Sequence, residues 1–227
     1  MAQGRGEIKA LLERHGIRPK RSLGQNFLGD PNLVDRIVRT ANVGPGDSVV
    51  EVGAGTGTLT RALAATGAAV LAFEVDTRLL PVLEEVLEGL EVEVRAEDVT
   101  KSDLDEILGA GPWTMVANLP YNVGTPLVLD VLRHVTVVTR MLVMVQREVA
   151  DRLVATAGSK PYGLPSIVTQ LNAEARVAFK VPPDVFFPVP EVESAVVELQ
   201  RITAPRLSEA AIELAGVAFQ QRRKMLR

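Results

Sequence analysis

The 227-residue sequence contains no cysteine and only two histidines, His15 and His134. Without thiols the chain can form no disulfide, bind no metal through thiolates and use no cysteine nucleophile. Two isolated histidines also make a histidine-based metal site unexpected. We therefore expect an activity that requires no metal and no covalent thiol intermediate.

Long apolar runs are missing as well. No uninterrupted stretch approaches the roughly 20 residues that span a bilayer, and residues 1–16 lack the apolar centre of a secretory signal peptide. A cytoplasmic protein with no membrane partner is therefore expected. Hydrophobic residues make up 47% of the chain, which is enough for the core of one substantial domain plus a small second part.

The net charge of −3 is unevenly distributed along the chain. Residues 1–22 and residues 201–227 each carry +4, so the segment between them carries −11. Two basic ends on an acidic body fit a protein that binds a polyanion locally. They fit ordinary solvated termini equally well, so charge alone leaves the partner open.

Apolar strands alternate with short helices from residue 47 onward. A helix is expected first, with Asp30 as its N-cap and Pro31 just inside its start. The alternation predicts βαβ units and a mostly parallel sheet covered on both faces. The expected strands are 48–53, 68–76, 91–98, 113–120 and 139–146, and the expected helices between them are 58–67, 78–89, 102–108 and 126–134.

The chain becomes rich in proline after Gly158, and no further strand is assigned there before a final helical stretch from Leu207. A boundary is placed at 200–205. We divide the chain into a main domain, 1–202, with a basic helical extension at its N-terminus, and a second part, 203–227.

Candidate ligand-binding residues stand at the carboxyl ends of four predicted strands, where parallel sheets bind ligands. The first strand leads into the glycines of "EVGAGTG", which allow sharp turns and close approach of a ligand. The second ends at Glu74, placed to accept hydrogen bonds from ribose hydroxyls. The third and fourth end at Asp98 and Asn118.

Two nucleotide-type ligands use this arrangement. A dinucleotide-binding loop requires G-x-G-x-x-G, but Thr58 occupies the third glycine position, which disfavours a nicotinamide oxidoreductase. The spacing G-x-G-x-G after Glu51 instead looks like the S-adenosylmethionine loop of class I methyltransferases. Such a loop alone is also compatible with a purely structural turn. The interpretation as an S-adenosylmethionine site therefore depends on the candidate ligand-binding residues at all four strand ends.

The stretch "NLPY" suits the methylation of an exocyclic amine. The side-chain oxygen of Asn118 and the backbone carbonyl of Leu119 would accept the two amine protons and favour a tetrahedral nitrogen. Pro120 would stiffen the carbonyl, and Tyr121 offers a ring on which a flipped-out base can stack. The plainer interpretation is an Asn-Pro turn with a packing tyrosine.

The chain resembles the small-subunit rRNA adenine dimethyltransferase family, which includes the kasugamycin-sensitivity methyltransferases and their Dim1 relatives. The matching segments run in order from Lys20 to about Val197 and include "KRSLGQNFL", "EVGAGTGTLT", "NLPYNVGTPLV", "MVQREVADRL" and "VFFPVPEVESAVV". "NLPYN" favours this family over the macrolide-resistance enzymes, which usually carry isoleucine in place of Leu119. The resemblance implies a Rossmann-like class I methyltransferase fold.

The resemblance also assigns residue roles. It implies that S-adenosylmethionine is bound by Gln25, Asn26, Leu28, Gly53, Gly55, Glu74, Asp98 and Asn118. The catalytic residues implied are Asn118, Leu119, Tyr121 and Phe186, with Phe186 and Tyr121 holding the target base between two rings. Phe187 makes the choice between the two phenylalanines uncertain, and one of them is expected in the core.

The implied function is N6,N6-dimethylation of two adjacent adenines near the 3′ end of small-subunit (16S) rRNA, on 30S particles, by a monomer. RNA contacts are expected from Lys20, Arg21, Arg222, Arg223 and Lys224. Residues 203–227 would be the start of a truncated helical domain. The alternatives are a macrolide-resistance-type large-subunit rRNA methyltransferase and a non-catalytic ribosome-assembly factor.

Overall fold

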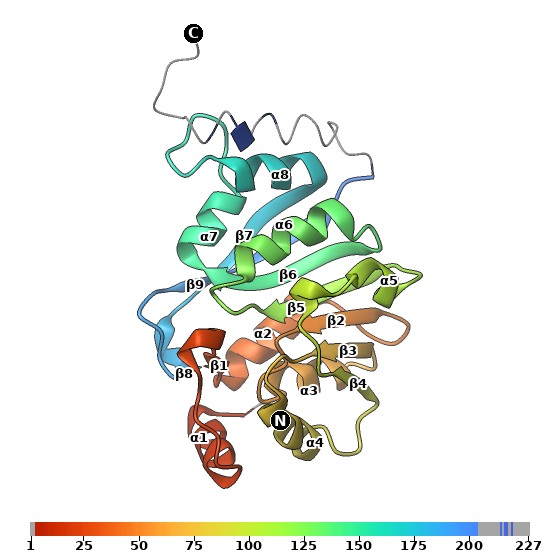
Figure 1. The fold of residues 1–227 in the computed structure, drawn as a ribbon, viewed down its shortest axis with the longest axis vertical. Helices are drawn as coiled ribbons and strands as arrows, with labels where there is room; N and C mark the ends of the chain where they lie inside the picture. The colour runs from red at the N-terminus through yellow and green to blue at the C-terminus, as the bar shows by residue number, and fades with distance from the viewer. Residues whose placement is uncertain (1–2, 204–213, 215, 218, 220–227) are drawn as a thin grey trace.

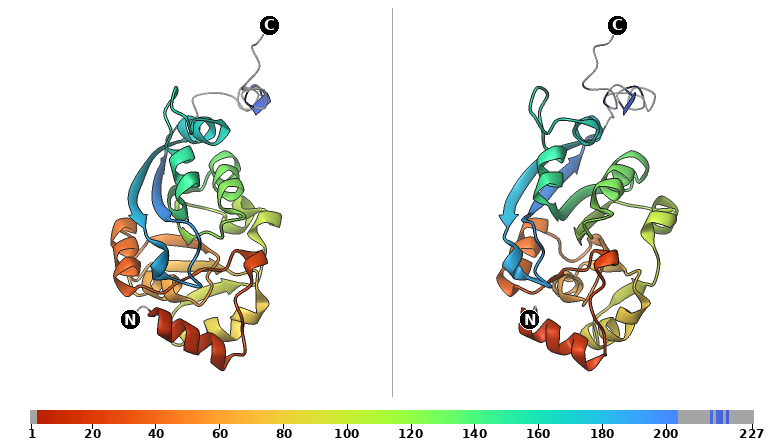
Figure 2. Two further views of the ribbon diagram at one scale, coloured as in Figure 1. Left: turned by 90° about the vertical axis from the view of Figure 1, so that its left-hand side faces the viewer. Right: turned by 60° about the vertical axis from the view of Figure 1, so that its left-hand side comes forward.

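The computed structural model describes residues 3–203, 214, 216–217 and 219. Its centre is a seven-stranded sheet with helices on both faces (Figures 1 and 2). Among the strands described, β9 alone runs against the other six. The strands, in their order across the sheet, are β4 (Val92–Arg95), β3 (Ala69–Phe73), β2 (Ser48–Val52), β5 (Trp113–Asn118), β6 (Val138–Gln146), β9 (Ser194–Arg201) and β7 (Ala173–Val181).

The predicted α/β fold with a mostly parallel sheet is confirmed, as are the predicted strands and helices up to β6. The helix α2 begins as expected, because the side chain of Asp30 accepts a hydrogen bond from the backbone N–H of Leu33 at 2.9 Å and Pro31 opens its first turn. The helices are α1 (Arg5–Arg14), α2 (Pro31–Ala41), α3 (Thr58–Ala64), α4 (Leu80–Val86), α5 (Leu104–Leu108), α6 (Gly124–His134), α7 (Arg147–Leu153) and α8 (Leu164–Asn172).

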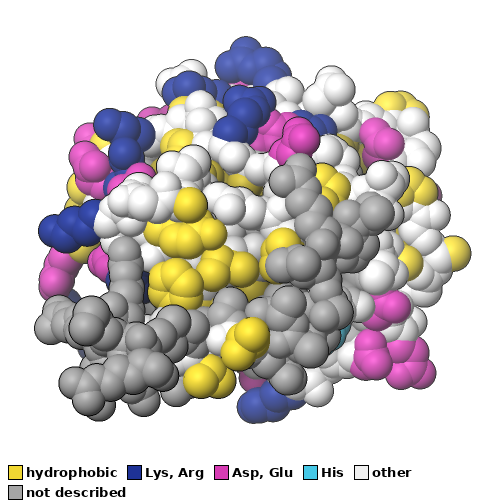
Figure 3. Space-filling model, turned by 90° about the horizontal axis from the view of Figure 1, so that it is seen from above, with side chains coloured by type: hydrophobic (Ala, Val, Ile, Leu, Met, Phe, Trp, Pro, Cys, Tyr) yellow, Lys and Arg dark blue, Asp and Glu magenta, His cyan; other side chains and the backbone are white. Residues whose placement is uncertain are grey.

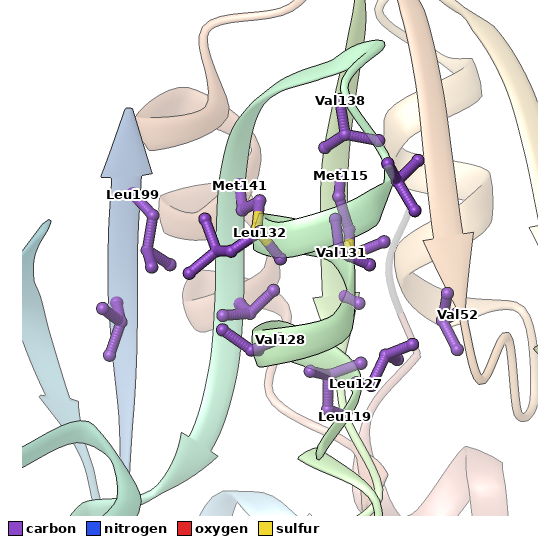
Figure 4. Close-up of a cluster of buried hydrophobic side chains, with 14 of the residues drawn as sticks. Val52, Met115, Leu119, Leu127, Val128, Val131, Leu132, Val138, Met141 and Leu199 are labelled. Carbon is purple, nitrogen blue, oxygen red and sulfur yellow. The ribbon is translucent and has the colours of Figure 1, made fainter. Parts of the chain in front are cut away.

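The core lies on both faces of the sheet because neighbouring strand residues point to opposite sides. Val50 of β2 belongs to the larger cluster, under α5 to α8, whereas Val49 belongs to the cluster under α2 and α3, and both are fully buried. Figure 4 shows part of the larger cluster, where α6 places Val128, Val131 and Leu132 over β5 and β6. Because both faces of the sheet are buried, the sequences of its strands are continuous apolar runs.

Two strands of the central sheet, β7 and β9, and the helix α8 lie after Gly158, where the sequence predicted no strand. The strand β9 is inserted between β6 and β7 and buries most of its "SAVVEL" segment, although it follows a proline-rich connection. The prolines at positions 182, 183, 188 and 190 all fall between β7 and β9, outside both strands, because proline cannot donate to a strand ladder. The proline content therefore marks the connection and not the whole region.

Short elements complete the fold around the carboxyl edge of the sheet. The two-stranded antiparallel sheet pairs Phe27 with Phe187 and Leu28 with Phe186. These elements are β1 (Phe27–Leu28), β8 (Phe186–Phe187) and the 3-10 turns η1 (Arg21–Leu23), η2 (Thr77–Leu79), η3 (Val99–Lys101) and η4 (Pro183–Val185).

The end of the molecule that carries α8 lies opposite the end that carries α1 (Figures 1 and 2). Seen from the α8 end, a group of apolar side chains is visible at the surface (Figure 3). The few residues described after 203 lie there: the ring of Phe219 is 6.0 Å from that of Tyr162, and Gly216 lies beside Leu164. Most of the predicted second part, 203–227, falls outside the described residues, so the boundary at 202 stays a prediction.

Candidate active site

A cleft opens at the carboxyl edge of the sheet, between the ends of β2, β3, β4 and β5. It consists of two cavities of about 60 and 160 Å³ that share Leu23, Gly53, Val75 and Pro120 in their walls. The first cavity is also lined by Asn26, Gly55, Glu74, Asn118 and Tyr121, and the second by Asp98. With Gln25 and Leu119, which also line the first cavity, nine of the predicted site residues therefore surround one cleft.

The glycine loop between β2 and α3 requires glycine for two physical reasons. Gly53 and Gly55 have φ angles of 81° and 59°, which side-chain-bearing residues rarely adopt. A Cβ at Gly55 would lie 3.0 Å from the ring of Phe27, which is closer than a real Cβ normally approaches. The loop is fixed to the next strand, because the N–H of Gly53 donates to the carbonyl of Phe73 at 2.8 Å.

Glu74 connects the second strand end to the glycine loop. Its carboxylate is 5% exposed and accepts hydrogen bonds from the N–H groups of Gly55 and Asp76, both at 2.8 Å. Burial raises the pKa of Glu74, and these two hydrogen bonds oppose that rise. Each of the two carboxylate oxygens is thus held by one backbone N–H group. The carboxylate forms part of the wall of the first cavity.

Asp98 is held in the ionised form at the third strand end. Hydrogen bonds from Thr100 and the ion pair with Lys101, at 3.0 Å, keep the pKa of Asp98 below its usual value. Its carboxylate therefore lines the second cavity as an acceptor.

Asn118 is oriented by the segment that precedes α2. Its side-chain NH₂ group donates to the backbone carbonyl of Asn26 at 3.0 Å, which leaves the side-chain oxygen to accept other hydrogen bonds. Leu119 is buried, and its N–H donates to the carbonyl of Met144 at 3.1 Å. The peptide between Asn118 and Leu119 is therefore fixed in place, directly before the Leu119 carbonyl that has to be positioned.

The ring of Tyr121 is fixed through its hydroxyl group, which lies 2.7 Å from the hydroxyl of Ser194. Ser194 is fully buried at the start of β9, and partial burial raises the pKa of Tyr121. No local sequence pattern indicates this partner, because Ser194 is 73 positions from Tyr121.

Phe186 does not face the cleft, which corrects the prediction that it stacks on the target base. It is 0% exposed and belongs to the cluster that contains Leu28 and Val34, so its ring offers no free face. Phe187 points to the opposite side of β8 and packs, half-buried, against the cluster formed with α1. Tyr121 is therefore the only one of these three aromatic residues that lines the cleft.

Gln25 lines the first cavity and Leu28 a neighbouring one, and their roles in cofactor binding stay predictions. Both ends of the Gln25 side chain already bind protein groups, the N–H of Lys20 and the carboxylate of Asp76. Leu28 is 4% exposed and borders a smaller cavity next to Glu51 and the glycine loop. Lys20 and Arg21 are exposed beside the cleft, whereas Arg222, Arg223 and Lys224 lie outside the described residues.

Within the described part of the chain, no group of three or more His, Cys, Asp or Glu residues is placed to hold a metal ion. A search of the same residues finds no helix that is both long and apolar enough to cross a membrane.

The fold and the cleft are those of a Rossmann-like methyltransferase, with a glycine loop after β2, an acid after β3 and "NLPY" at the end of β5. The sequence model of the family described as "Ribosomal RNA adenine dimethylase" matches residues 16–226. The chain therefore belongs to the ribosomal RNA adenine dimethylase family and is a methyltransferase, which rules out the nicotinamide oxidoreductase.

Known proteins agree with this assignment. Over 228 residues the chain is 44% identical to the ribosomal RNA small subunit methyltransferase A of Enterococcus faecalis, covering 96% of this chain and 77% of the relative. The structure of a dimethyladenosine transferase from Plasmodium falciparum has a TM-score of 0.76 at 27% identity, covering 88% of this chain and 73% of that one. For the 23S rRNA methyltransferase ErmE the TM-score is 0.72 at 30% identity, with coverage of 86% and 78%.

Proposed function

We propose that this protein transfers methyl groups from S-adenosylmethionine to the N6 amines of two adjacent adenines near the 3′ end of small-subunit rRNA. The observation that carries the proposal is the orientation of Asn118. Because its NH₂ group donates to Asn26, its oxygen is left to accept a hydrogen bond from an amine in the cleft. The names of the similar relatives support a small-subunit substrate.

The cleft residues fit S-adenosylmethionine. Gly53 and Gly55 carry no side chain where the loop borders the cavity, so the loop backbone stays accessible to a ligand. Glu74 would accept from the ribose hydroxyls, and Asp98, an ionised acceptor, would receive the adenine amine. Asn26 and Leu28 would border the methionine end. When bound, S-adenosylmethionine supplies a methyl group on a positively charged sulfur.

The chain's own residues would prepare the target amine. The lone pair of an adenine amine is delocalised into the ring, which makes the nitrogen a weak nucleophile. If the Asn118 oxygen and the Leu119 carbonyl accept hydrogen bonds from its two N–H groups, the lone pair becomes available for in-line attack. The nitrogen would gain the methyl group as the methyl–sulfur bond breaks, the sulfur would leave as a neutral thioether, and the extra proton on the nitrogen would pass to water. The same groups would orient the monomethylated amine, which still has one proton, for the second transfer.

The target base has to leave its stack to reach this position, and Tyr121 would compensate part of the cost. Stacking on one aromatic ring contributes roughly 1–3 kcal/mol per base. Because Phe186 is buried, the proposed platform is the Tyr121 ring alone. Its hydroxyl bond to Ser194 would fix the ring before the base arrives.

We extend the proposal to the partners. Lys20 and Arg21 are exposed beside the cleft and would contact phosphates, together with Arg222, Arg223 and Lys224. The substrate would be rRNA within 30S particles, the site of action the cytoplasm, and the active form a monomer.

The test is single-turnover methyl transfer to unmethylated 30S particles, with 50S particles in a parallel reaction. Asn118→Ala should lose at least about 100-fold in rate, as when one preorganised polar group is removed. Asn32→Ala, an exposed substitution on α2, is the matched control and should keep the parental rate. A parental rate in Asn118→Ala would contradict the mechanism. Methylation of 50S particles alone would favour the large-subunit alternative, and no methylation of either would favour the assembly factor.

A further inference from the structure

Residues 20–26, which we call the strap, run along the first cavity between the turn after β5 and the segment after β3. Leu23, Gly24, Gln25 and Asn26 line this cavity. On the β5 side the strap is held by side-chain amides: Asn118 donates to the carbonyl of Asn26 at 3.0 Å, and Asn122 donates to that of Ser22 at 3.4 Å. The strap is thus fixed to the "NLPYN" turn.

On the β3 side one side chain holds the strap. The NH₂ group of Gln25 donates to Asp76 at 2.9 Å, and its oxygen accepts from the N–H of Lys20 at 2.7 Å. Gln25 therefore closes a turn within the strap and joins that turn to the segment after β3. This differs from the role of a cofactor ligand, because both polar ends bind the protein itself.

Asp76 connects the strap to the cofactor residue Glu74. Its carboxylate is buried and accepts from the guanidinium of Arg78 at 2.8 and 2.5 Å, whereas its backbone N–H donates to Glu74 at 2.8 Å. The hydrogen bonds and charge of Arg78 lower the pKa of Asp76 to about 2, so Asp76 is ionised at neutral pH. A buried carboxylate is thereby shared between Arg78 and Gln25.

We propose that Gln25 is a positioning residue whose hydrogen bond to Asp76 holds the strap closed over the cofactor and keeps the wall formed by Glu74 in place. Its loss frees the β3 side of the strap, while the β5 side stays held by Asn118 and Asn122. The consequence is faster release of S-adenosylmethionine and of its demethylated product, with little change in methyl transfer once the cofactor is bound. This inference rests on the proposed function.

The decisive variant is Gln25→Glu, which is nearly the same size. One glutamate oxygen still accepts from Lys20, but the other faces the Asp76 carboxylate, so the contact becomes repulsive. We expect cofactor affinity to fall about 10-fold or more, the range for hydrogen bonds to a charged group. Most of the loss should appear as faster dissociation. The KM for S-adenosylmethionine should rise accordingly, with kcat within about 3-fold of the parent on this account.

A second substitution, at Asp76, distinguishes loss of the positioning hydrogen bond from general damage to the fold. In Gln25→Glu/Asp76→Asn the asparagine oxygen still accepts from the Nε of Arg78, while the asparagine amide and the terminal NH₂ group of Arg78 can both donate to the new carboxylate. This restores the hydrogen bond with donor and acceptor exchanged. Affinity should return to within about 3-fold of the parent, well inside the range lost with one such bond. Gln200→Glu is the matched charge control and should bind the cofactor normally, because Gln200 is exposed on β9 and its side chain donates to the carbonyl of Thr139.

Calorimetric titration with S-adenosylmethionine and stopped-flow dissociation of the product, on the purified full chain, need no RNA. Steady-state methyl transfer to 30S particles gives kcat and KM. Parental affinity in Gln25→Glu, a loss that Asp76→Asn does not reverse, or a fall in kcat without a rise in KM would overturn the inference. Failure of the parent protein to bind S-adenosylmethionine would instead contradict the proposed function. Gln25→Ala, which adds no charge, should show a smaller loss in the same direction.

Discussion

The hydroxyl of Tyr121 lies 2.7 Å from that of Ser194, which joins the turn after β5 to the first residue of β9. Ser194 is fully buried and pairs with Gln146 of β6, so it is fixed by the sheet. The tyrosine ring at the cleft is therefore positioned by the strand that was least apparent in the sequence.

The first prediction distinguishes the contribution of the Tyr121 hydroxyl from that of the Tyr121 ring. Tyr121→Phe and Ser194→Ala each remove the same neutral hydrogen bond, worth about 0.5–1.5 kcal/mol, so each should slow single-turnover methylation about 2- to 10-fold. The double variant should be no slower than either single one, because both act on one contact. Tyr121→Ala should lose more, since it also removes the stacking surface. Additive losses in the double variant would show that the hydroxyl pair does not act as a unit.

The second prediction concerns Glu74. Glu74→Ala should weaken S-adenosylmethionine binding by about 1.5–3 kcal/mol, the range for hydrogen bonds to a charged group. It also frees the N–H groups of Gly55 and Asp76, so thermal unfolding has to be measured alongside calorimetric binding. Glu93→Ala, an exposed acid on β4, is the control. Normal affinity in a folded Glu74→Ala protein would remove Glu74 from the cofactor site.

The third prediction concerns pH and Glu51. Its side chain is 1% exposed and one oxygen has no hydrogen-bond partner among the described residues. Burial, together with the charge of Glu74, raises the pKa of Glu51 to about 8 from 4.5. Between these values the folded protein holds a proton that the unfolded chain has released. The free energy of unfolding therefore falls as pH rises through this window, by about 1.4 kcal/mol per pH unit.

Glu51→Gln mimics the neutral form and removes this dependence. Its stability relative to the parent should increase steadily from about pH 5 to about pH 8, as measured by urea denaturation at several pH values. Glu13→Gln, at an exposed position on α1, should follow the parent at every pH. Parallel curves for Glu51→Gln and the parent would mean that Glu51 is already ionised in the folded state.

The fourth prediction tests the packing of α6 against β9. The guanidinium of Arg201 donates to the carbonyls of Val131, Leu132, Val135 and Val138, at 2.8 to 2.9 Å. Leu132 lies in the last turn of α6 and Val135 directly after it, where carbonyls have no partner within the helix. Arg201→Met should lower the free energy of unfolding by about 1–3 kcal/mol, because buried acceptors lose their donor. Lys9→Met, which breaks an exposed ion pair on α1, should cost less than about 1 kcal/mol in the same denaturant assay.

The glycine loop, Glu74, Asp98 and Asn118 could be predicted from the sequence because each follows directly from its own strand, and parallel strands bring their carboxyl ends together. Phe186 could not be assigned, because its direction depends on the pairing of β8 with β1, and a shift of one residue exchanges the faces of Phe186 and Phe187. Ser194 and Asp76 were missed for the same reason. Their roles arise from contacts between segments that no local pattern joins.

The position of β9 has a consequence for synthesis of the protein on the ribosome. The strand β7 is bonded in the sheet only to β9, and β9 follows β7 in the chain. While a nascent chain emerges N-terminus first, β7 has to wait unpaired until residues 194–201 appear and insert beside β6. Ser194 arrives with that same strand, so the ring of Tyr121 gains its anchor only when the sheet closes. Completion of the fold and completion of the active site are thereby one event.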